Sequence, residues 1–326
     1  MRAVVCRQWG GPESLTVETV ASRKLEAGQV RLRVRASGIN FADTLMVAGK
    51  YQVKPEFPFT PGMEAAGEIT EIGPGVRGFS VGQRVMATAR GGGTYADELA
   101  ANADSVVAIP DAMDFVTAAS FPVVYGTSHF ALTRRGNLRR GEVLLVLGAA
   151  GGVGLTAVEI GKQLGATVIA AAGGPDKLAV AREHGADNLI DYTRESIRER
   201  VRELTGGNGA DVVYDPVGGD AFDQALRAVN WEARMLVIGF ASGRIQAVPA
   251  NLILVKNISV IGVVWGAQAA RDPALASRWL TELLGWWEQG KLKPVVGATF
   301  PLARAGDAMN ALLSRKHAGK IVLTCD

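Results

Sequence analysis

The stretch that decides the fold is Val143–Gly154, which has the sequence VLLVLGAAGGVG. Its first five residues form an apolar run of the length of a buried parallel strand. Four glycines follow within the stretch, and residues 155–164 then repeat apolar side chains at helical spacing. Strand, glycine turn and helix together predict a phosphate cradle, because glycines let backbone N–H groups approach a phosphate and a helix N-terminus carries partial positive charge.

The glycine spacing departs from the usual dinucleotide pattern G-x-G-x-x-G, because Ala150 stands at the second glycine position. The pattern here is G-x-x-G-x-x-G, through Gly148, Gly151 and Gly154. Taken alone, this string also fits a plain tight turn. A strand before it, a helix after it and a second strand at residues 166–172 favour dinucleotide binding.

The composition is that of an ordinary globular protein, with 48% hydrophobic and 21% charged residues, and 326 residues suit two domains. A net charge of +3 without a dense basic run gives no support for nucleic-acid binding. Two cysteines, Cys6 and Cys325, make neither a disulfide framework nor a cysteine-rich metal site. No secretory signal or membrane-spanning apolar run is visible, so we expect a cytoplasmic protein that does not bind membranes.

The order of predicted elements indicates an α/β chain. Residues 1–110 hold short strand candidates between Gly and Pro turns, which predicts a small barrel-like β domain. After Gly141, six parallel-type strands alternate with helices, the count of a doubly wound dinucleotide-binding (Rossmann) fold. A long helix at Pro273–Gln289, a helix at Leu302–Arg315 and a strand at Ile321–Thr324 are expected to complete the first domain. The predicted domains are residues 1–122 with 266–326, and residues 123–265.

The end of the second strand of this alternation bears on the choice of nicotinamide cofactor. Domains that prefer NAD place an acid about 20 residues beyond the glycine turn, whereas Gly173 and Gly174 occupy this region here. These glycines leave room for a 2′-phosphate, to which Lys177 can offer charge and Tyr192 a hydroxyl. A charge-assisted hydrogen bond of about 1.5–3 kcal/mol gives about one to two decades of preference for NADPH. The alternative is an exposed helix lysine and a packing tyrosine.

Four motifs together resemble one known family. They are Gly38–Asp43 (GINFAD), Pro61–Gly67 (PGMEAAG), Val81–Val85 (VGQRV) and the glycine turn Gly148–Gly154, in that order. In this combination the chain resembles the zinc-free quinone oxidoreductase branch of the medium-chain dehydrogenase/reductase superfamily, the relatives of zeta-crystallin. The resemblance covers essentially the whole chain. It implies a GroES-like β-barrel catalytic domain and a doubly wound Rossmann domain that binds NADPH.

The residues themselves argue against zinc. Zinc alcohol dehydrogenases of this superfamily carry Cys near the position of Asn40 and His where Met63 stands, and a catalytic zinc needs several such ligands. Histidine occurs here only at positions 129, 184 and 317, and none lies near Asn40 or Met63 in sequence. We therefore expect no metal. His184 and His317 are interpreted as surface residues, and Glu64 as either structural or part of a substrate pocket.

Without zinc, the accessible chemistry is hydride transfer to an electrophile that is already conjugated to a carbonyl, and the cofactor carries that reaction. The resemblance therefore implies a zinc-independent NADPH:quinone oxidoreductase. It places Asn40 and Tyr51 in the cleft beside the nicotinamide as catalytic residues. The Asn40 amide could fix the ribose or the substrate carbonyl, and Tyr51 could stack on a flat substrate or donate its hydroxyl. A turn asparagine and a packed aromatic are the alternatives.

The resemblance also implies a set of cofactor contacts. Those at the diphosphate are Ala150, Gly151, Gly152 and Val153, and those at the adenosine phosphate are Gly173, Gly174, Lys177 and Tyr192. Those at the nicotinamide half are Asn40, Thr127, Phe240, Ala241, Ser242, Val263, Val264, Trp265 and Lys320. For Lys320 the alternative is an ordinary surface lysine.

Two further functions stay open. The same site could serve a medium-chain enoyl or alkenal reductase, acting on 2-alkenals, 2-enones or enoyl thioesters. A cofactor-binding crystallin-like or RNA-binding protein without relevant catalysis is the third reading, although the modest charge and the lack of a basic stripe argue against RNA. The strand near Ile258–Val264 is very apolar and last in its sheet, which predicts a homodimer joined through this edge.

Overall fold

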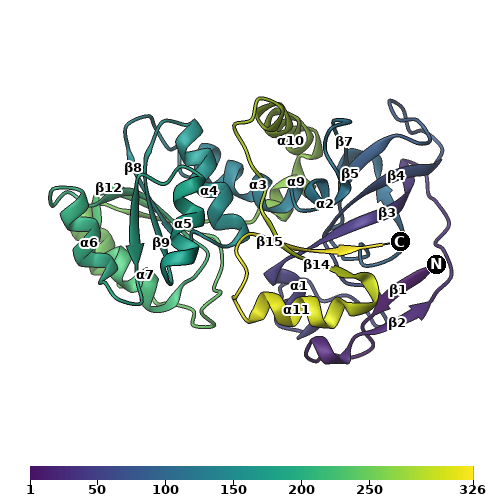
Figure 1. The fold of residues 1–326 in the computed structure, drawn as a ribbon, viewed down its shortest axis with the longest axis horizontal. Helices are drawn as coiled ribbons and strands as arrows, with labels where there is room; N and C mark the ends of the chain where they lie inside the picture. The colour runs from purple at the N-terminus through teal and green to yellow at the C-terminus, as the bar shows by residue number, and fades with distance from the viewer. Residues whose placement is uncertain (326) are drawn as a thin grey trace. The chain divides into compact units, whose positions relative to one another are not determined.

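The computed structural model describes residues 1–325 and divides the chain into two compact units (Figure 1). The first unit comprises Met1–Val123, Gly266–Glu288 and the chain from Pro294 onward, and the second comprises Val124–Trp265 with Gln289–Lys293. The segment Gln289–Lys293 belongs to the second unit because its backbone is bonded to one of that unit's helices. The Lys293 N–H donates to Glu159 Oε1 over 2.9 Å.

The first unit contains a seven-stranded sheet of order β14-β15-β3-β4-β5-β7, with β6 paired to β3, and a separate sheet of β1 and β2. The strands are β1 Arg2–Val5, β2 Thr16–Thr19, β3 Gln29–Ile39, β4 Glu64–Ile72, β5 Arg84–Thr88, β6 Glu98–Asn102, β7 Val106–Ala108, β14 Val296–Pro301 and β15 Lys320–Thr324. Buried apolar residues of β3, β4, β5 and β15 form one core with the helix α11. The β-rich first domain expected from the sequence is confirmed.

The helices of the first unit are short apart from α10. Its helices are α1 Phe41–Val47, α2 Phe115–Ala119, α9 Trp265–Arg271, α10 Pro273–Glu288 and α11 Ala305–Leu313. Helix α9 begins at Trp265, which still belongs to the second unit. Turns of 3-10 type lie at Pro12–Ser14, Ala103–Ser105 and Leu302–Arg304. Helix α10 confirms the long helix expected in this region, whereas α9 and the strand β14 were not predicted. The strand expected at Tyr95–Leu99 begins three residues later, because the backbone of Tyr95 is bonded to Pro61 and Val4 and only Glu98 onward pairs with β3.

The second unit is a parallel six-stranded sheet of order β10-β9-β8-β11-β12-β13 with helices on both faces (Figure 1). The strands are β8 Val143–Leu147, β9 Thr167–Ala172, β10 Asn188–Asp191, β11 Ala210–Asp215, β12 Val229–Val237 and β13 Ser259–Gly262. The helices are α3 Pro122–His129, which begins in the first unit, a π-helical continuation Phe130–Arg135, α4 Gly152–Gln163, α5 Pro175–Glu183, α6 Ile197–Leu204, α7 Gly219–Leu226 and α8 Ala250–Lys256. The predicted six-strand alternation is confirmed, and β13 is the edge strand that was expected.

Local chemistry explains several of these boundaries. Helix α3 begins at Pro122, since proline has no N–H to donate and is tolerated in a first helical turn. Asp114 caps α2 by accepting the Thr117 N–H over 2.8 Å, and Ser196 caps α6 by accepting from Glu199. Strand β8 is buried along nearly its whole length, as expected for a central parallel strand.

No helix within residues 1–325 combines the length and the apolar character that crossing a bilayer requires.

Candidate active site

The glycine turn joins β8 to α4 in the second unit. Gly148 has φ +59°, a conformation that glycine adopts without strain. A Cβ on Gly154 would collide with the Gly148 carbonyl and lie 2.8 Å from Ala149 Cα, so this position accepts only glycine. Gly151, by contrast, is exposed, and a Cβ there would meet only the Gly148 oxygen, at 3.4 Å. The turn is therefore closely packed at Gly154 and has free space at Gly151.

The first backbone N–H groups of α4 make no hydrogen bond within the helix. The first helical hydrogen bond of α4 is made by the Leu155 N–H, which donates to the Gly151 carbonyl over 2.9 Å. The N–H groups of Gly152 and Val153 therefore precede the helical hydrogen-bond pattern, and they carry the partial positive charge of the helix N-terminus. Neither Gly151 nor its neighbours supplies a side-chain cap. An anion placed over Gly151 would meet these donors.

Gly173 and Gly174 follow β9 and lie beside Tyr192. A Cβ on Gly173 would lie 3.3 Å from a ring carbon of Tyr192 and 3.5 Å from its hydroxyl oxygen, and Tyr192 is 41% exposed. Gly174 has φ +90°, and a Cβ there would meet nothing within 4 Å. Lys177 stands in the first turn of α5, directly after these glycines, and is half-buried. The structure therefore places Gly173, Gly174 and Lys177 on one strand-to-helix turn and Tyr192 against Gly173.

An acid that sequence reasoning missed supports this loop. Asp191, at the end of β10, accepts from the Gly174 N–H over 3.1 Å and from the Thr193 hydroxyl over 2.6 Å. The Thr193 hydroxyl, then the Gly174 N–H, lowers the pKa of Asp191 below its ordinary value. Its carboxylate is thus committed to the loop backbone. The signal in the sequence was an Asp at a strand end, two residues before a Thr.

Asp215, at the end of β11, is a second acid that the sequence analysis missed. It is fully buried, and its Oδ1 accepts the N–H groups of Val217 and Gly218, each over 2.8 Å. Its Oδ2 has no hydrogen-bond partner in residues 1–325. Burial is the main cause that raises the pKa of Asp215 to about 6. The run Asp215–Gly219, DPVGG, directly after a strand was the available signal.

The loop anchored by Asp215 holds the loop that follows β12. The Ala241 N–H donates to the Pro216 carbonyl over 3.0 Å, and the Ser242 N–H donates to the Val217 carbonyl over 2.8 Å. A Cβ on Gly218 would lie 3.3 Å from Phe240 Cδ1, so these two loops are in close contact. Phe240, Ala241 and Ser242 therefore lie at the carboxyl edge of the sheet, where ligands of doubly wound folds bind.

The remaining predicted residues of the second unit lie on α3 and after β13. Thr127 is 8% exposed, and its neighbour Gly126 lies against the indole of Trp265, which is also buried. Val263 is buried and its N–H donates to the Val237 carbonyl over 3.0 Å, whereas Val264 is 59% exposed. Trp265 is thus part of the packing under α3.

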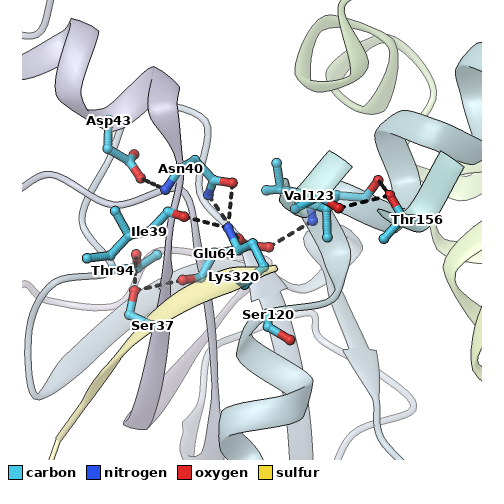
Figure 2. Close-up of polar contacts among 12 residues, drawn as sticks. Ser37, Ile39, Asn40, Asp43, Glu64, Thr94, Ser120, Val123, Thr156 and Lys320 are labelled. Carbon is cyan, nitrogen blue, oxygen red and sulfur yellow. Dashed lines mark hydrogen bonds and ion pairs between the residues drawn. The ribbon is translucent and has the colours of Figure 1, made fainter. Parts of the chain in front are cut away.

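The first unit contains a buried polar cluster of Asn40, Asp43, Glu64, Tyr95 and Lys320. Figure 2 shows four of its members, Asn40, Asp43, Glu64 and Lys320. Lys320, the first residue of β15, donates from Nζ to Asn40 Oδ1 over 2.7 Å and to Glu64 Oε1 over 2.7 Å. Lys320 is 5% exposed, which excludes the surface-lysine alternative. Glu64, fully buried at the start of β4, also accepts the Val123 N–H over 2.8 Å.

Asp43 forms the second half of this cluster. Its Oδ2 accepts the backbone N–H of Asn40 and the hydroxyl of Tyr95, each over 2.8 Å, and its Oδ1 has no partner in residues 1–325. Burial raises the pKa of Asp43 to about 7, against the lowering effect of these bonds and of Lys320. Burial and Asp43 likewise raise the pKa of Tyr95.

Tyr51 is half-buried and packs against the core of the first unit. Burial and then the charge of Asp43 raise the pKa of its hydroxyl. At the pH of a cell the side chain is therefore a hydrogen-bond donor rather than a phenolate. The structure places Tyr51 within the electrostatic reach of the cluster that holds Asn40.

The histidines differ from their sequence interpretation. The side chain of His184 is only 9% exposed and shares a 2.7 Å hydrogen bond with Glu159, so its interpretation as a surface residue is wrong. The reason is that α5 turns its end toward α4, where Glu159 also accepts the Tyr125 hydroxyl over 2.6 Å. His129 is buried, and burial lowers its pKa to about 4. Within residues 1–325, no group of three or more His, Cys, Asp or Glu side chains could hold a metal ion.

Comparison with known proteins adds two family matches. Residues 26–111 match the family model described as alcohol dehydrogenase GroES-like domain, and residues 152–282 match the one described as zinc-binding dehydrogenase. The first of these identifies the β-rich unit as GroES-like.

Individual relatives match over nearly the whole chain. The chain is 41% identical to quinone oxidoreductase-like protein 2 homolog of Nematostella vectensis, over 99% of this chain and 88% of that protein. It is 34% identical to a quinone oxidoreductase of Pseudomonas aeruginosa, over 97% of each. Among solved structures, Escherichia coli quinone oxidoreductase complexed with NADPH matches with a TM-score of 0.93 and 30% identity, over 100% of each chain.

Proposed function

We propose that this chain, which belongs to the quinone oxidoreductase-like branch of the medium-chain dehydrogenase/reductase superfamily, is an NADPH-dependent reductase of quinones or other conjugated carbonyls that works without a metal. The observation that carries the proposal is the glycine turn, in which backbone atoms pack closely against Gly154 whereas Gly151 is exposed. A diphosphate needs this combination of exposed N–H donors and absent side chains. The relative solved with NADPH supports the choice of cofactor.

The adenosine half of the cofactor would lie over Gly173 and Gly174. Because a Cβ at Gly174 would meet nothing within 4 Å, the space can take a 2′-phosphate. Lys177 would supply a positive charge and Tyr192 a hydroxyl, while Asp191 is turned to the loop backbone. This arrangement favours NADPH over NADH.

Other residues proposed to contact the cofactor lie in both units. We propose that the nicotinamide half of the cofactor lies near the loop Phe240–Ser242, Thr127 and the segment Val263–Trp265. The loop and the segment follow the carboxyl ends of β12 and β13, where ligands of this fold bind, and Thr127 neighbours Gly126, which contacts Trp265. When bound, the cofactor supplies a hydride. The protein would orient the acceptor, with Asn40 offering its amide and Tyr51 offering its ring face or its hydroxyl.

Initial rates with NADPH test the reaction. A panel of substituted 1,4-benzoquinones is compared with a panel of 2-alkenals, 2-enones and enoyl thioesters at equal concentration. We expect turnover of quinones. Turnover confined to the second panel would instead identify an enoyl or alkenal reductase. Tight NADPH binding with no turnover in either panel would contradict catalysis and favour a cofactor-binding protein.

Lys177→Ala tests the 2′-phosphate site. The loss of a charge-assisted bond of about 1.5–3 kcal/mol should weaken NADPH binding about 10- to 100-fold and leave NADH binding nearly unchanged. Both dissociation constants can be measured from the fluorescence of the reduced cofactor. Lys291→Ala, which removes the same charge from an exposed position of the same unit, is the control. An equal loss for both cofactors would show that Lys177 does not discriminate between them.

We also propose that two copies pair through the free edge of β13. Among the described residues 1–325, this strand has a neighbour on one side only, β12, and it is followed by the exposed Val264. An apolar edge strand of this kind pairs readily with a second copy of itself.

A further inference from the structure

Within the buried polar cluster, Glu64 and Lys320 fix the direction of one hydrogen-bond donor on Asn40. We infer that Asn40 presents one carboxamide N–H, held in place by the Lys320–Glu64 ion pair, to the substrate oxygen on which negative charge develops. This inference rests on the function proposed above. It makes Asn40 a catalytic residue, whereas Lys320 and Glu64 are positioning residues that act through it.

The charges around Asn40 allow only one orientation of its amide. Oδ1 accepts from the Lys320 ammonium over 2.7 Å, and Nδ2 donates to the Glu64 carboxylate over 2.9 Å (Figure 2). Rotating the amide by half a turn would place its NH₂ group against the ammonium and its oxygen against the carboxylate. Two attractive contacts would become two repulsive ones, so the ion pair determines which side of the amide carries the donors.

The donors of Lys320 are all in use. An ammonium group has three N–H bonds, and Nζ has three acceptors: the Ile39 carbonyl over 2.6 Å, Asn40 Oδ1 and Glu64 Oε1. A direct side-chain bond from Lys320 to a cofactor or substrate would require one of these to break. Lys320 therefore affects a bound molecule through Asn40 rather than by contact.

Asn40 has one donor left. Its Nδ2 carries two N–H bonds, of which one goes to Glu64, and residues 1–325 supply no acceptor for the second. Asn40 is 8% exposed, compared with 5% for Lys320 and 0% for Glu64, so it is the member of this trio nearest to solvent. A buried donor without an acceptor is energetically costly, so a hydrogen bond from this N–H to an oxygen of a bound molecule would be strongly favourable.

The reaction creates such an oxygen. A hydride added to the conjugated carbon of a quinone brings two electrons, and the π electrons move onto the carbonyl oxygen. The product of this step is an enolate that carries the transferred hydrogen on its ring carbon, and the nicotinamide is oxidised from NADPH to NADP⁺. A proton from water then adds to the enolate, and transfer of a ring C–H proton to the second carbonyl oxygen through water gives the hydroquinone. A fixed N–H aimed at the enolate oxygen stabilises the transition state more than the neutral quinone. The sugar hydroxyls of the cofactor are the other acceptor of the same chemistry.

Asn40→Ala separates the two acceptors. Loss of one preorganised donor should lower kcat for 1,4-benzoquinone about 100-fold, with kcat/KM falling equally and the Kd for NADPH changing less than about 3-fold. Asn310→Ala, at an exposed position of α11 in the same unit, is the matched control. A tenfold rise in the Kd for NADPH with unchanged kcat would assign the N–H to the cofactor and overturn the inference.

A vibrational measurement tests the hydrogen bond without turnover. In a complex of the protein with NADP⁺ and 1,4-benzoquinone, no hydride is available. Infrared difference spectra should show one quinone C=O stretch moved to lower wavenumber in the wild type, and this shift should be absent in Asn40→Ala. Equal carbonyl frequencies in both proteins would contradict the inference.

The double variant Glu64→Gln/Lys320→Met tests the positioning residues while Asn40 stays in place. Without the charges, the Asn40 amide can turn and accept from Gln at position 64, so we expect kcat to fall at least tenfold while NADPH binding and folding persist. Unchanged kcat would show that the ion pair is merely structural. If the wild type reduces no quinone or enone, the proposed function fails and the inference fails with it. An active wild type with an equally active Asn40→Ala overturns the inference alone.

Discussion

Removing the buried cation Lys320 should strongly destabilise the first unit. Lys320 and Glu64 lie 2.7 Å apart, and their side chains are 6% and 0% exposed. Removal of one partner of a buried ion pair leaves an uncompensated charge, which costs about 3–5 kcal/mol. Lys320→Met keeps the length of the side chain but not its charge, so Glu64 would keep its Val123 and Asn40 donors and lose its counter-ion.

The double variant Glu64→Gln/Lys320→Met should recover most of this loss. A neutral amide at position 64 can still accept the Val123 N–H, and Asn40 is then free to turn and bond to its NH₂ group. Replacing both members of a buried pair by neutral residues of similar volume is often close to neutral. A double-mutant cycle should therefore give a coupling free energy of about 2–4 kcal/mol between the two positions.

Thermal unfolding measures this effect. For domains of 150–250 residues, 1 kcal/mol corresponds to about 2–4 °C in Tm, so Lys320→Met should lower the Tm by about 6–20 °C. Arg304→Met removes a cation whose side chain is 60% exposed and paired with Asp307, so it should cost at most about 1 kcal/mol. The reasoning is refuted if Lys320→Met is no more destabilising than Arg304→Met, or if the double variant loses as much as the two single variants together.

Four further substitutions test other parts of the structure. The pKa of Asp43 is raised to about 7, so the folded state holds this proton more tightly than the unfolded state, and stability should fall as pH rises from about 4 to about 7. Asp43→Asn mimics the protonated acid, so it should match wild type at pH 4 and be more stable, by a few kcal/mol, at pH 8 in denaturant titrations. Gly154→Ala should impair folding, whereas Gly151→Ala should fold normally and lose NADPH affinity at least tenfold, because its methyl group fills the open side of the turn; normal NADPH binding by Gly151→Ala would move the diphosphate elsewhere. Ile261→Lys places a charge on the edge strand β13 and should yield monomers in sedimentation velocity runs in which the wild type sediments as a dimer; a dimeric variant would locate the interface on another face.

Features that depend on neighbours in sequence were predictable. The apolar run Val143–Leu147, the glycines after it and the helical spacing beyond them are local signals, and they predicted β8 and α4 almost to the residue. Gly173, Gly174 and Lys177 could be placed on one strand-to-helix turn for the same reason, and their contact with a 2′-phosphate stays a prediction. The β14 strand was missed because the preceding and following helices gave a stronger pattern than its six residues did.

Contacts between distant segments were not predictable from one sequence. Lys320 lies 280 residues from Asn40 and 256 from Glu64, and no local pattern distinguishes it from a surface lysine. His184 looked exposed because it ends a polar helix, and its partner Glu159 lies 25 residues away on α4. The buried acids Asp43 and Asp215 were overlooked because a carboxyl group is expected at the surface. Only the structure shows the backbone N–H groups that bond to these two side chains in the interior.

The buried cluster also explains why separate motifs of the first unit occur together. Gly38–Asp43 supplies Asn40 and Asp43, Pro61–Gly67 supplies Glu64, and the segment Ala318–Lys320 supplies the cation. Two carboxyl groups and one ammonium share this interior, and the ammonium is bonded to Glu64. Burial raises the pKa of Asp43 to about 7, although the Asn40 N–H, the Tyr95 hydroxyl and the charge of Lys320 each lower it. Asn40 is bonded through its backbone to Asp43 and through its side chain to the ion pair, so the three segments together determine the position of one amide. We therefore expect a substitution in any of these three segments to change the position of the Asn40 amide first.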